Sequence, residues 1–157
     1  MPFTLKPIDA SHALSSTYGK NIAVNPYQGC VFACEFCSAI KMNFFTGRTK
    51  EKWDKTGWGN WLDYKTNLVE LLYKEREKVK KSKIYFGNAT DIYMPIERKL
   101  KLVPPILEFL STIRRLNLKC RRAAHHVILR ELYPYCRNSR KKRAFWSVIL
   151  FIPTATM

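Results

Sequence analysis

The spacing of apolar residues between positions 60 and 81 predicts an α-helix. Apolar side chains recur there every three or four residues, at Trp61, Tyr64, Leu68, Leu71, Leu72 and Val79, which places them on one helical face. Lys78, Lys80 and Lys81 crowd the end of this segment, where the helix dipole favours positive charge. We therefore interpret this basic run as a solvated helix end that needs no nucleic-acid partner.

Two short apolar runs predict strands. Asn21 to Val24 forms one run, and Pro26 just after it favours an extended backbone. Ile84 to Phe86 forms the other, and Gly87 follows it directly. A second helical pattern covers residues 100–116. Because proline is tolerated only in the first turn of a helix, Pro104 and Pro105 predict that this helix begins at about Val103.

Three cysteines in eight residues are the strongest chemical feature of the chain. Cys30, Cys34 and Cys37 have the spacing C-x3-C-x2-C, with Phe36 just before the last thiol. Three thiolates can hold a 4Fe-4S cluster and leave one iron free to bind a small molecule. The triplet therefore predicts an iron–sulfur site and a reducing, cytoplasmic environment.

The cysteines have two other conceivable uses. A structural zinc site needs four ligands, and the candidates for the fourth, Cys120, His125 and His126, lie more than 80 residues after Cys37. A disulfide framework needs an even number of cysteines and a secretory signal. The chain has five cysteines and an amino terminus with no apolar signal segment, so the iron–sulfur hypothesis is favoured.

The residues around the cysteines resemble a known family. Asn25 to Cys37 looks like the cluster loop of the radical S-adenosylmethionine (radical SAM) superfamily, in the branch of spore photoproduct lyase. Gly87 to Glu97 is similar to a segment after the second strand in that branch, and Lys65-Thr-Asn67 is similar to a motif before its first long helix. The resemblance covers about residues 20–110.

The resemblance implies a site and an activity. Cys30, Cys34 and Cys37 would be the metal ligands, and the S-adenosylmethionine site would be formed by Phe36, Gly87, Asn88, Thr90 and Asp91. The implied reaction is reductive cleavage of S-adenosylmethionine to a 5'-deoxyadenosyl radical, with an electron donor of the flavodoxin or ferredoxin type. The implied class is a lyase in DNA repair, with DNA as a candidate substrate. No catalytic residue beyond the cofactor site can be assigned.

The resemblance also implies a fold. We expect an α/β chain that forms the amino-terminal part of a partial (β/α) radical SAM barrel, truncated after about two to three βα units. Residues 1–20 would be an extension, residues 21–118 the partial core, and residues 119–157 a basic tail.

The tail differs in composition from the rest of the chain. Residues 1–110 carry 14 lysines, 3 arginines and 11 acids, whereas residues 111–157 carry 3 lysines, 8 arginines and one acid. No strand, turn and amphipathic helix repeat past Leu118, and the apolar run Phe145 to Ile152 is too short to cross a membrane. The tail is therefore either a basic arm for nucleic-acid phosphates or, as we favour, sequence read out of frame.

Other functions stay open from the sequence alone. The aromatic and lysine-rich segment from Met42 to Trp61 can be a lid over a cofactor or a surface on which bases stack. A second functional class is a basic nucleic-acid-binding module whose fold is stabilised by a bound zinc ion. A third is an inactive remnant that folds poorly.

Overall fold

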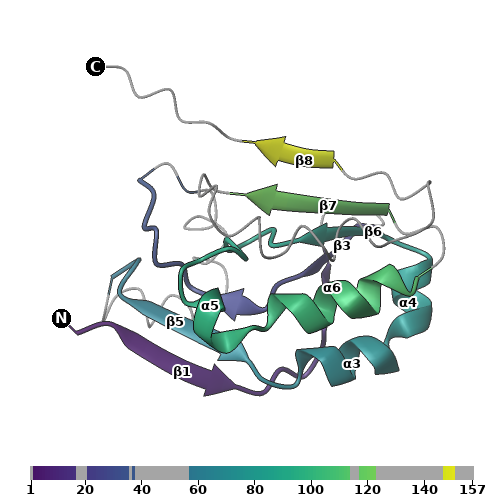
Figure 1. Ribbon diagram of the computed structural model, residues 1–157, viewed down its shortest axis with the longest axis horizontal. Coiled ribbons are helices and arrows are strands. Elements are labelled where there is room, and N and C mark those ends of the chain that lie inside the picture. Colours follow the sequence, from purple (N-terminus) through teal and green to yellow (C-terminus); the bar gives the residue numbers. More distant parts are fainter. Residues whose placement is uncertain are drawn as a thin grey trace.

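The structure is a computed structural model that describes residues 2–16, 21–35, 37, 57–113, 117–122 and 147–150, the last two segments by their backbone alone. Within this part of the chain, the strands form two separate sheets (Figure 1). Both sheets mix parallel with antiparallel pairing.

The smaller sheet has the strand order β1-β5-β4. Its strands are β1 (Thr4–Ile8), β5 (Trp61–Lys65) and β4 (Tyr27–Gln28). β1 runs parallel to β5, and β4 runs antiparallel to it. The central strand of this sheet is therefore supplied from the middle of the chain.

The larger sheet has the strand order β2-β3-β6-β7-β8. Its strands are β2 (Leu14–Ser16), β3 (Asn21–Val24), β6 (Lys83–Phe86), β7 (Asn117–Arg122) and β8 (Ser147–Leu150). β2 and β3 are antiparallel, whereas β3, β6, β7 and β8 are parallel. The carboxyl ends of β3 and β6 therefore meet at one edge.

In the described residues, four helices connect and cover these strands. They are α3 (Leu68–Lys74), α4 (Arg76–Lys80), α5 (Glu97–Leu100) and α6 (Val103–Ser111). In Figure 1, α6 lies in front of the larger sheet, and α3 and α4 lie beside it. None of the helices in the described segments has the length and apolar character needed to cross a membrane.

Two apolar clusters form the interior. The first joins the larger sheet to the helices through side chains such as Ile84, Phe86, Leu72 and Ile106, all at most 1% exposed. The second contains Tyr27, Cys30, Leu62 and Met94. Burial of this apolar surface is the main favourable contribution to folding, and the second cluster places Cys30 inside it.

The expected partial (β/α) barrel is wrong. The described strands form two small mixed sheets. In the smaller sheet, β1 and β5 are parallel neighbours but do not belong to a run of consecutive βα units. β2 also pairs antiparallel with β3, which an all-parallel barrel does not contain. The chain is therefore an arrangement of two mixed sheets and short helices.

The predicted helix over residues 60–81 is wrong at its start. Residues 61–65 form β5, because their backbone groups pair with β1 and β4 on both sides. The helix begins at Leu68 and is divided at Glu75 into α3 and α4. Its basic carboxyl end is confirmed by the exposed Lys78, Lys80 and Lys81.

The other predicted elements are mostly confirmed. β3 covers Asn21–Val24, and β6 includes the predicted run from Ile84 to Phe86. α6 begins at Val103, with proline in its first turn, and ends at Ser111. These elements carry clear local sequence features.

The two ends of the chain contribute strands. β1 and β2 lie within the predicted extension of residues 1–20. Past Leu118, the described backbone contains the rest of β7, which reaches Arg122, and β8, which pairs with it. The domain boundaries and the loss of reading frame stay predictions. Most of the segment from Met42 to Trp61 lies outside the described residues.

Candidate metal and cofactor site

The two sequence blocks of the predicted site follow two neighbouring parallel strands. Val24, the last residue of β3, is paired in register with Phe86, the last residue of β6. The cysteine segment follows β3, and the turn that starts at Gly87 follows β6. The N–H of Gly87 donates to the carbonyl of Val24 at 3.0 Å. Both blocks therefore leave the sheet at the same edge.

Buried polar side chains tie the two blocks together. The Oδ1 atom of Asn25 accepts a hydrogen bond from the N–H of Ala89 at 3.1 Å. The hydroxyl of Thr90 donates to the carbonyl of Tyr27 at 3.3 Å. Asn25 and Thr90 are both buried. Because an unpaired buried polar group is costly, these bonds define how the two blocks meet.

Cys30 also contacts the second block. Its side chain is 7% exposed, and backbone N–H groups of Phe32 and Asp91 donate to its sulfur. Burial raises the pKa of the Cys30 thiol, the two N–H groups oppose this effect, and the nearby Asp91 and Cys37 add to it. The structure thus brings Cys30 and Asp91 together from blocks that are far apart in sequence.

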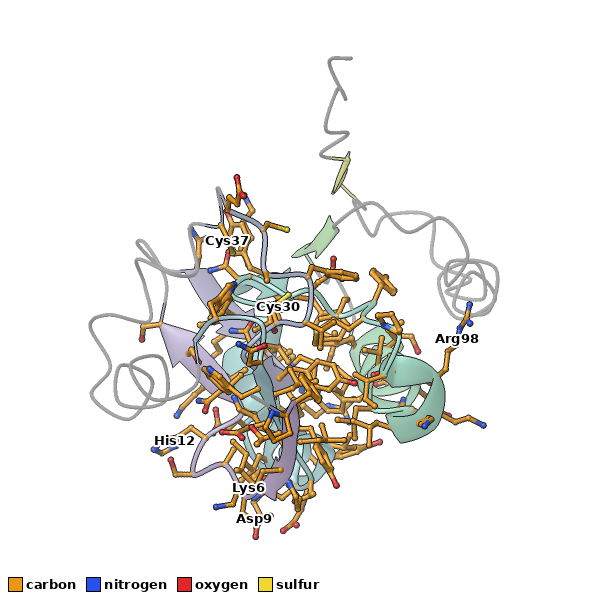
Figure 2. The ribbon with its side chains drawn as sticks, turned by 90° about the vertical axis from the view of Figure 1, so that its left-hand side faces the viewer. Lys6, Asp9, His12, Cys30, Cys37 and Arg98 are labelled. Atoms are coloured by element: carbon orange, nitrogen blue, oxygen red, sulfur yellow. The ribbon has the colours of Figure 1, made fainter. Side chains whose placement is uncertain are left out.

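Cys34 and Cys37 lie on the outer part of the same loop. Both are half-buried, and the N–H of Cys37 donates to the carbonyl of Cys34 at 3.0 Å. Figure 2 shows Cys37 in the upper part of the view and Cys30 below it, with both above Lys6, Asp9 and His12. The three cysteines therefore belong to one local structure.

The donor chemistry of this loop fits an iron–sulfur cluster, but its three thiols do not form a metal-binding group in this structure. Three thiols lie within eight residues, and Cys30 sulfur already accepts two N–H bonds of the kind that tune cluster sulfurs. Among the described residues, no group of three or more Cys, His, Asp or Glu side chains is close enough to hold a metal ion. Metal binding would therefore require the outer cysteines to approach Cys30.

Gly29 fixes the path of the chain into Cys30. Its φ is +85°, and a Cβ atom there would lie 2.5 Å from the carbonyl oxygen of Trp61 and 2.8 Å from its ring. Only glycine permits both this backbone conformation and this close approach. The cysteine loop is consequently held against β5 as well as against the Gly87 turn.

Two buried residues beside the site, Tyr27 and Glu97, were not predicted from the sequence. The hydroxyl of Tyr27 donates to Oε2 of Glu97, and the N–H of Val103 donates to Oε1 of Glu97 at 2.7 Å. Burial raises the pKa of the Glu97 carboxyl, and burial together with Glu97 raises the pKa of Tyr27. Both residues lie inside the resembling segments, but their contact becomes visible only in the structure.

The remaining predicted site residues have mixed placements. Gly87, Thr90 and Asp91 lie on the turn beside Cys30, and Asn88 is half-buried on the same turn. Phe36, His125 and His126 lie outside the described residues. The backbone of Cys120 is aligned with Phe86 in the larger sheet.

The Lys65-Thr-Asn67 motif contributes away from the cysteines. The amide side chain of Asn67 accepts from the N–H of Ala10 and donates to its carbonyl, both at 2.9 Å. Lys65 is buried, and its backbone N–H donates to the carbonyl of Pro26 at 3.0 Å. Burial lowers the pKa of the Lys65 ammonium. The two hydrogen bonds of Asn67 therefore join the segment after β1 to the start of α3, and we call this pair of bonds the Asn67 clip.

The chain is similar to the uncharacterized protein MJ0683 of Methanocaldococcus jannaschii, with 33% identity over 114 residues. The similar region is 72% of this chain and 38% of that protein. No family model matches the chain, and no solved structure matches it significantly. The chain thus spans well under half the length of this relative, whose name states no activity.

Proposed function

We propose that this chain is the cofactor-binding part of a radical SAM enzyme that resembles spore photoproduct lyase. Cys30, Cys34 and Cys37 would bind one 4Fe-4S cluster, and the turn from Gly87 to Asp91 would bind S-adenosylmethionine beside it. Phe36 is proposed to line the same cofactor site. DNA is the substrate that the resemblance favours.

One contact carries this proposal: the N–H of Asp91 donates to the sulfur of Cys30. The two segments were singled out separately in the sequence, and they lie about 60 residues apart. A cysteine loop with a purely structural role would not need a buried polar turn from another part of the chain beside one of its sulfur atoms. The contact therefore supports a shared site for a metal group and a polar ligand.

Each part of the site has a distinct task. The thiolates would hold the cluster, which supplies one electron to S-adenosylmethionine. The Thr90 hydroxyl donates to Tyr27, so its oxygen can still accept a hydrogen bond from a ligand ammonium. Leu62 and Met94, both fully buried, exclude water from the inner side of Cys30.

The electron would come from a protein of the flavodoxin or ferredoxin type. Residues 1–110, which exclude the tail, carry 14 lysines and 3 arginines against 11 acids. A positive surface accelerates association with an acidic partner and makes the rate depend on salt. An acidic electron-transfer protein is therefore the donor that suits this chain best.

Anaerobic reconstitution tests the proposal. Chain incubated with iron and sulfide is expected to become brown, to bind about four irons per chain, and to cleave S-adenosylmethionine to 5'-deoxyadenosine when dithionite is added. Cys30→Ser, Cys34→Ser and Cys37→Ser should each abolish stable iron binding, because each removes a thiolate ligand. Cys120→Ser is the matched control and should bind iron normally.

Two other outcomes would contradict the proposal. Colourless protein with one tightly bound zinc, lost in Cys120→Ser, would favour the zinc-stapled nucleic-acid module. Protein that binds neither metal and gains no protection from protease on incubation with iron and sulfide would indicate an inactive remnant.

A further inference from the structure

We propose that Tyr27 and Glu97 form a positioning pair that holds Cys30 as the fixed member of the three-cysteine loop. The proposal rests on the function proposed above, since it assigns these residues to the preparation of that metal site. Neither residue would touch the metal. Both would act through the backbone that carries Cys30.

Three contacts connect residues 27–30 with residues 90–97. The Thr90 hydroxyl donates to the Tyr27 carbonyl, the Asp91 N–H donates to the Cys30 sulfur, and the Tyr27 hydroxyl donates to the Glu97 carboxylate. We call these five residues the brace. The brace holds Tyr27 at its backbone and at its side-chain tip, three residues before Cys30.

Glu97 is itself firmly anchored. Its carboxylate accepts bonds from the backbone N–H groups of Val103 and Leu102 at the start of α6, and its own N–H donates to the Met94 carbonyl at 2.9 Å. Val103 is fully buried in the first apolar cluster. The Tyr27 hydroxyl is therefore connected through Glu97 to the start of α6 and the first apolar cluster.

Because both side chains are buried, the hydrogen bond between Tyr27 and Glu97 tolerates little displacement. Tyr27 is 1% exposed and Glu97 is 4% exposed. If Tyr27 moved away, a buried hydroxyl and a buried carboxylate oxygen would both lose their partner, which is costly in a low-dielectric interior. An apolar residue at position 27 would fill the same space but would impose no such direction.

The other two cysteines have no comparable anchor among the described residues. Cys34 and Cys37 are half-buried and joined by a local turn. Since the thiols must gather before they can share a metal group, the outer turn is the part expected to move. Cys30 would then stay in place while Cys34 and Cys37 close on it.

Selective alkylation tests the pair without any metal. Reduced protein is pulsed with iodoacetamide, and the modification of each cysteine is followed by mass spectrometry. In Tyr27→Phe, the rate at Cys30 is expected to rise about tenfold, because loss of a buried hydrogen bond favours local opening of the loop. The rates at Cys34 and Cys37 should change by less than about twofold.

Two further variants separate positioning from general loss of stability. Leu72→Ala opens a cavity in the first cluster and lowers global stability without changing the brace. At an equal loss of unfolding free energy, measured by urea denaturation, its Cys30 rate should rise less than that of Tyr27→Phe. Glu97→Gln should resemble Tyr27→Phe, and the double variant should raise the Cys30 rate no further than the single variants do, as expected for residues that act as one unit.

Iron retention gives a second measurement. After reconstitution, Tyr27→Phe and Glu97→Gln should release iron to a chelator faster than the wild type. The pairing is overturned if Cys30 is alkylated at the wild-type rate in both variants, or if all three thiols accelerate together. If the wild type takes up no iron, the proposed function fails, and the alkylation pattern alone decides whether the pair positions Cys30.

Discussion

At the residue scale, the buried polar side chains gather around the cysteine loop. The six in the described part of the chain are Asn25, Asp63, Lys65, Thr90, Asp91 and Glu97. Four of them belong to the two segments that meet at Cys30. Buried polar groups are retained only where their partners are supplied, so their concentration marks the region in which geometry is most strongly specified.

Lys65 gives a test of the cost of a buried charge. Burial lowers the pKa of its ammonium below the ordinary value of 10.5, so the unfolded chain binds more protons than the folded chain at alkaline pH. Unfolding free energy should therefore rise as pH rises through the folded pKa toward 10.5. Lys65→Met removes this contribution and should stabilise the chain at neutral pH.

Denaturation with urea at several pH values measures this effect. The advantage of Lys65→Met over the wild type should shrink as pH rises, because the wild-type lysine loses its charge. Lys99→Met, at an exposed position, is the control and should show little change. An advantage that is the same at every pH would show that packing, and not charge, causes the difference.

At the element scale, elements with local sequence features were predictable. β3, β6 and the start of α6 follow from apolar runs and from Pro104 and Pro105. β5 was not predictable, because Trp61 and Tyr64 are three residues apart and fit a helix as well as they fit a buried strand. Pairing with β1, far away in sequence, decided between the two.

The site residues likewise fall into those that could be predicted from local sequence features and those that could not. The three cysteines and the Gly87 turn were identified from spacing and order, which are local properties. The Tyr27–Glu97 contact joins residues 70 apart, and nothing in the local pattern around either residue predicts it. Side-chain pairs of this kind become visible only when the fold places them together.

The Asn67 clip gives a prediction at this scale. Its amide forms two hydrogen bonds with the backbone of Ala10 and so joins the segment after β1 to the start of α3. Asn67→Ala should lower the free energy of unfolding by about 1–3 kcal/mol, because Ala10 loses both partners in a partly buried position. Urea denaturation measures this loss.

Thr66→Ala is the matched control for the clip. The Thr66 hydroxyl donates to Asp9 in an exposed position, where water can replace the lost bond. Its effect should be within about 0.5 kcal/mol, as for most surface substitutions. Equal losses in the two variants would show that Asn67 is no special connection.

At the scale of the whole molecule, charge opposes compaction. A net charge of +16 on 157 residues produces self-repulsion that salt screens. The midpoint of thermal unfolding is therefore expected to rise when sodium chloride is increased from low ionic strength to about 0.15 M. Lys78→Gln combined with Lys81→Gln should reduce this increase, and a midpoint independent of salt would contradict the expectation.

The parallel pairing of β1 with β5 also bears on how the chain is made. Thr4 is in register with Trp61, so during translation the first strand leaves the ribosome before its partner exists. At typical synthesis rates the delay is about 3 to 11 seconds. Lys6 and Pro7 lie within β1, and both residue types discourage a waiting strand from pairing with a neighbouring nascent chain.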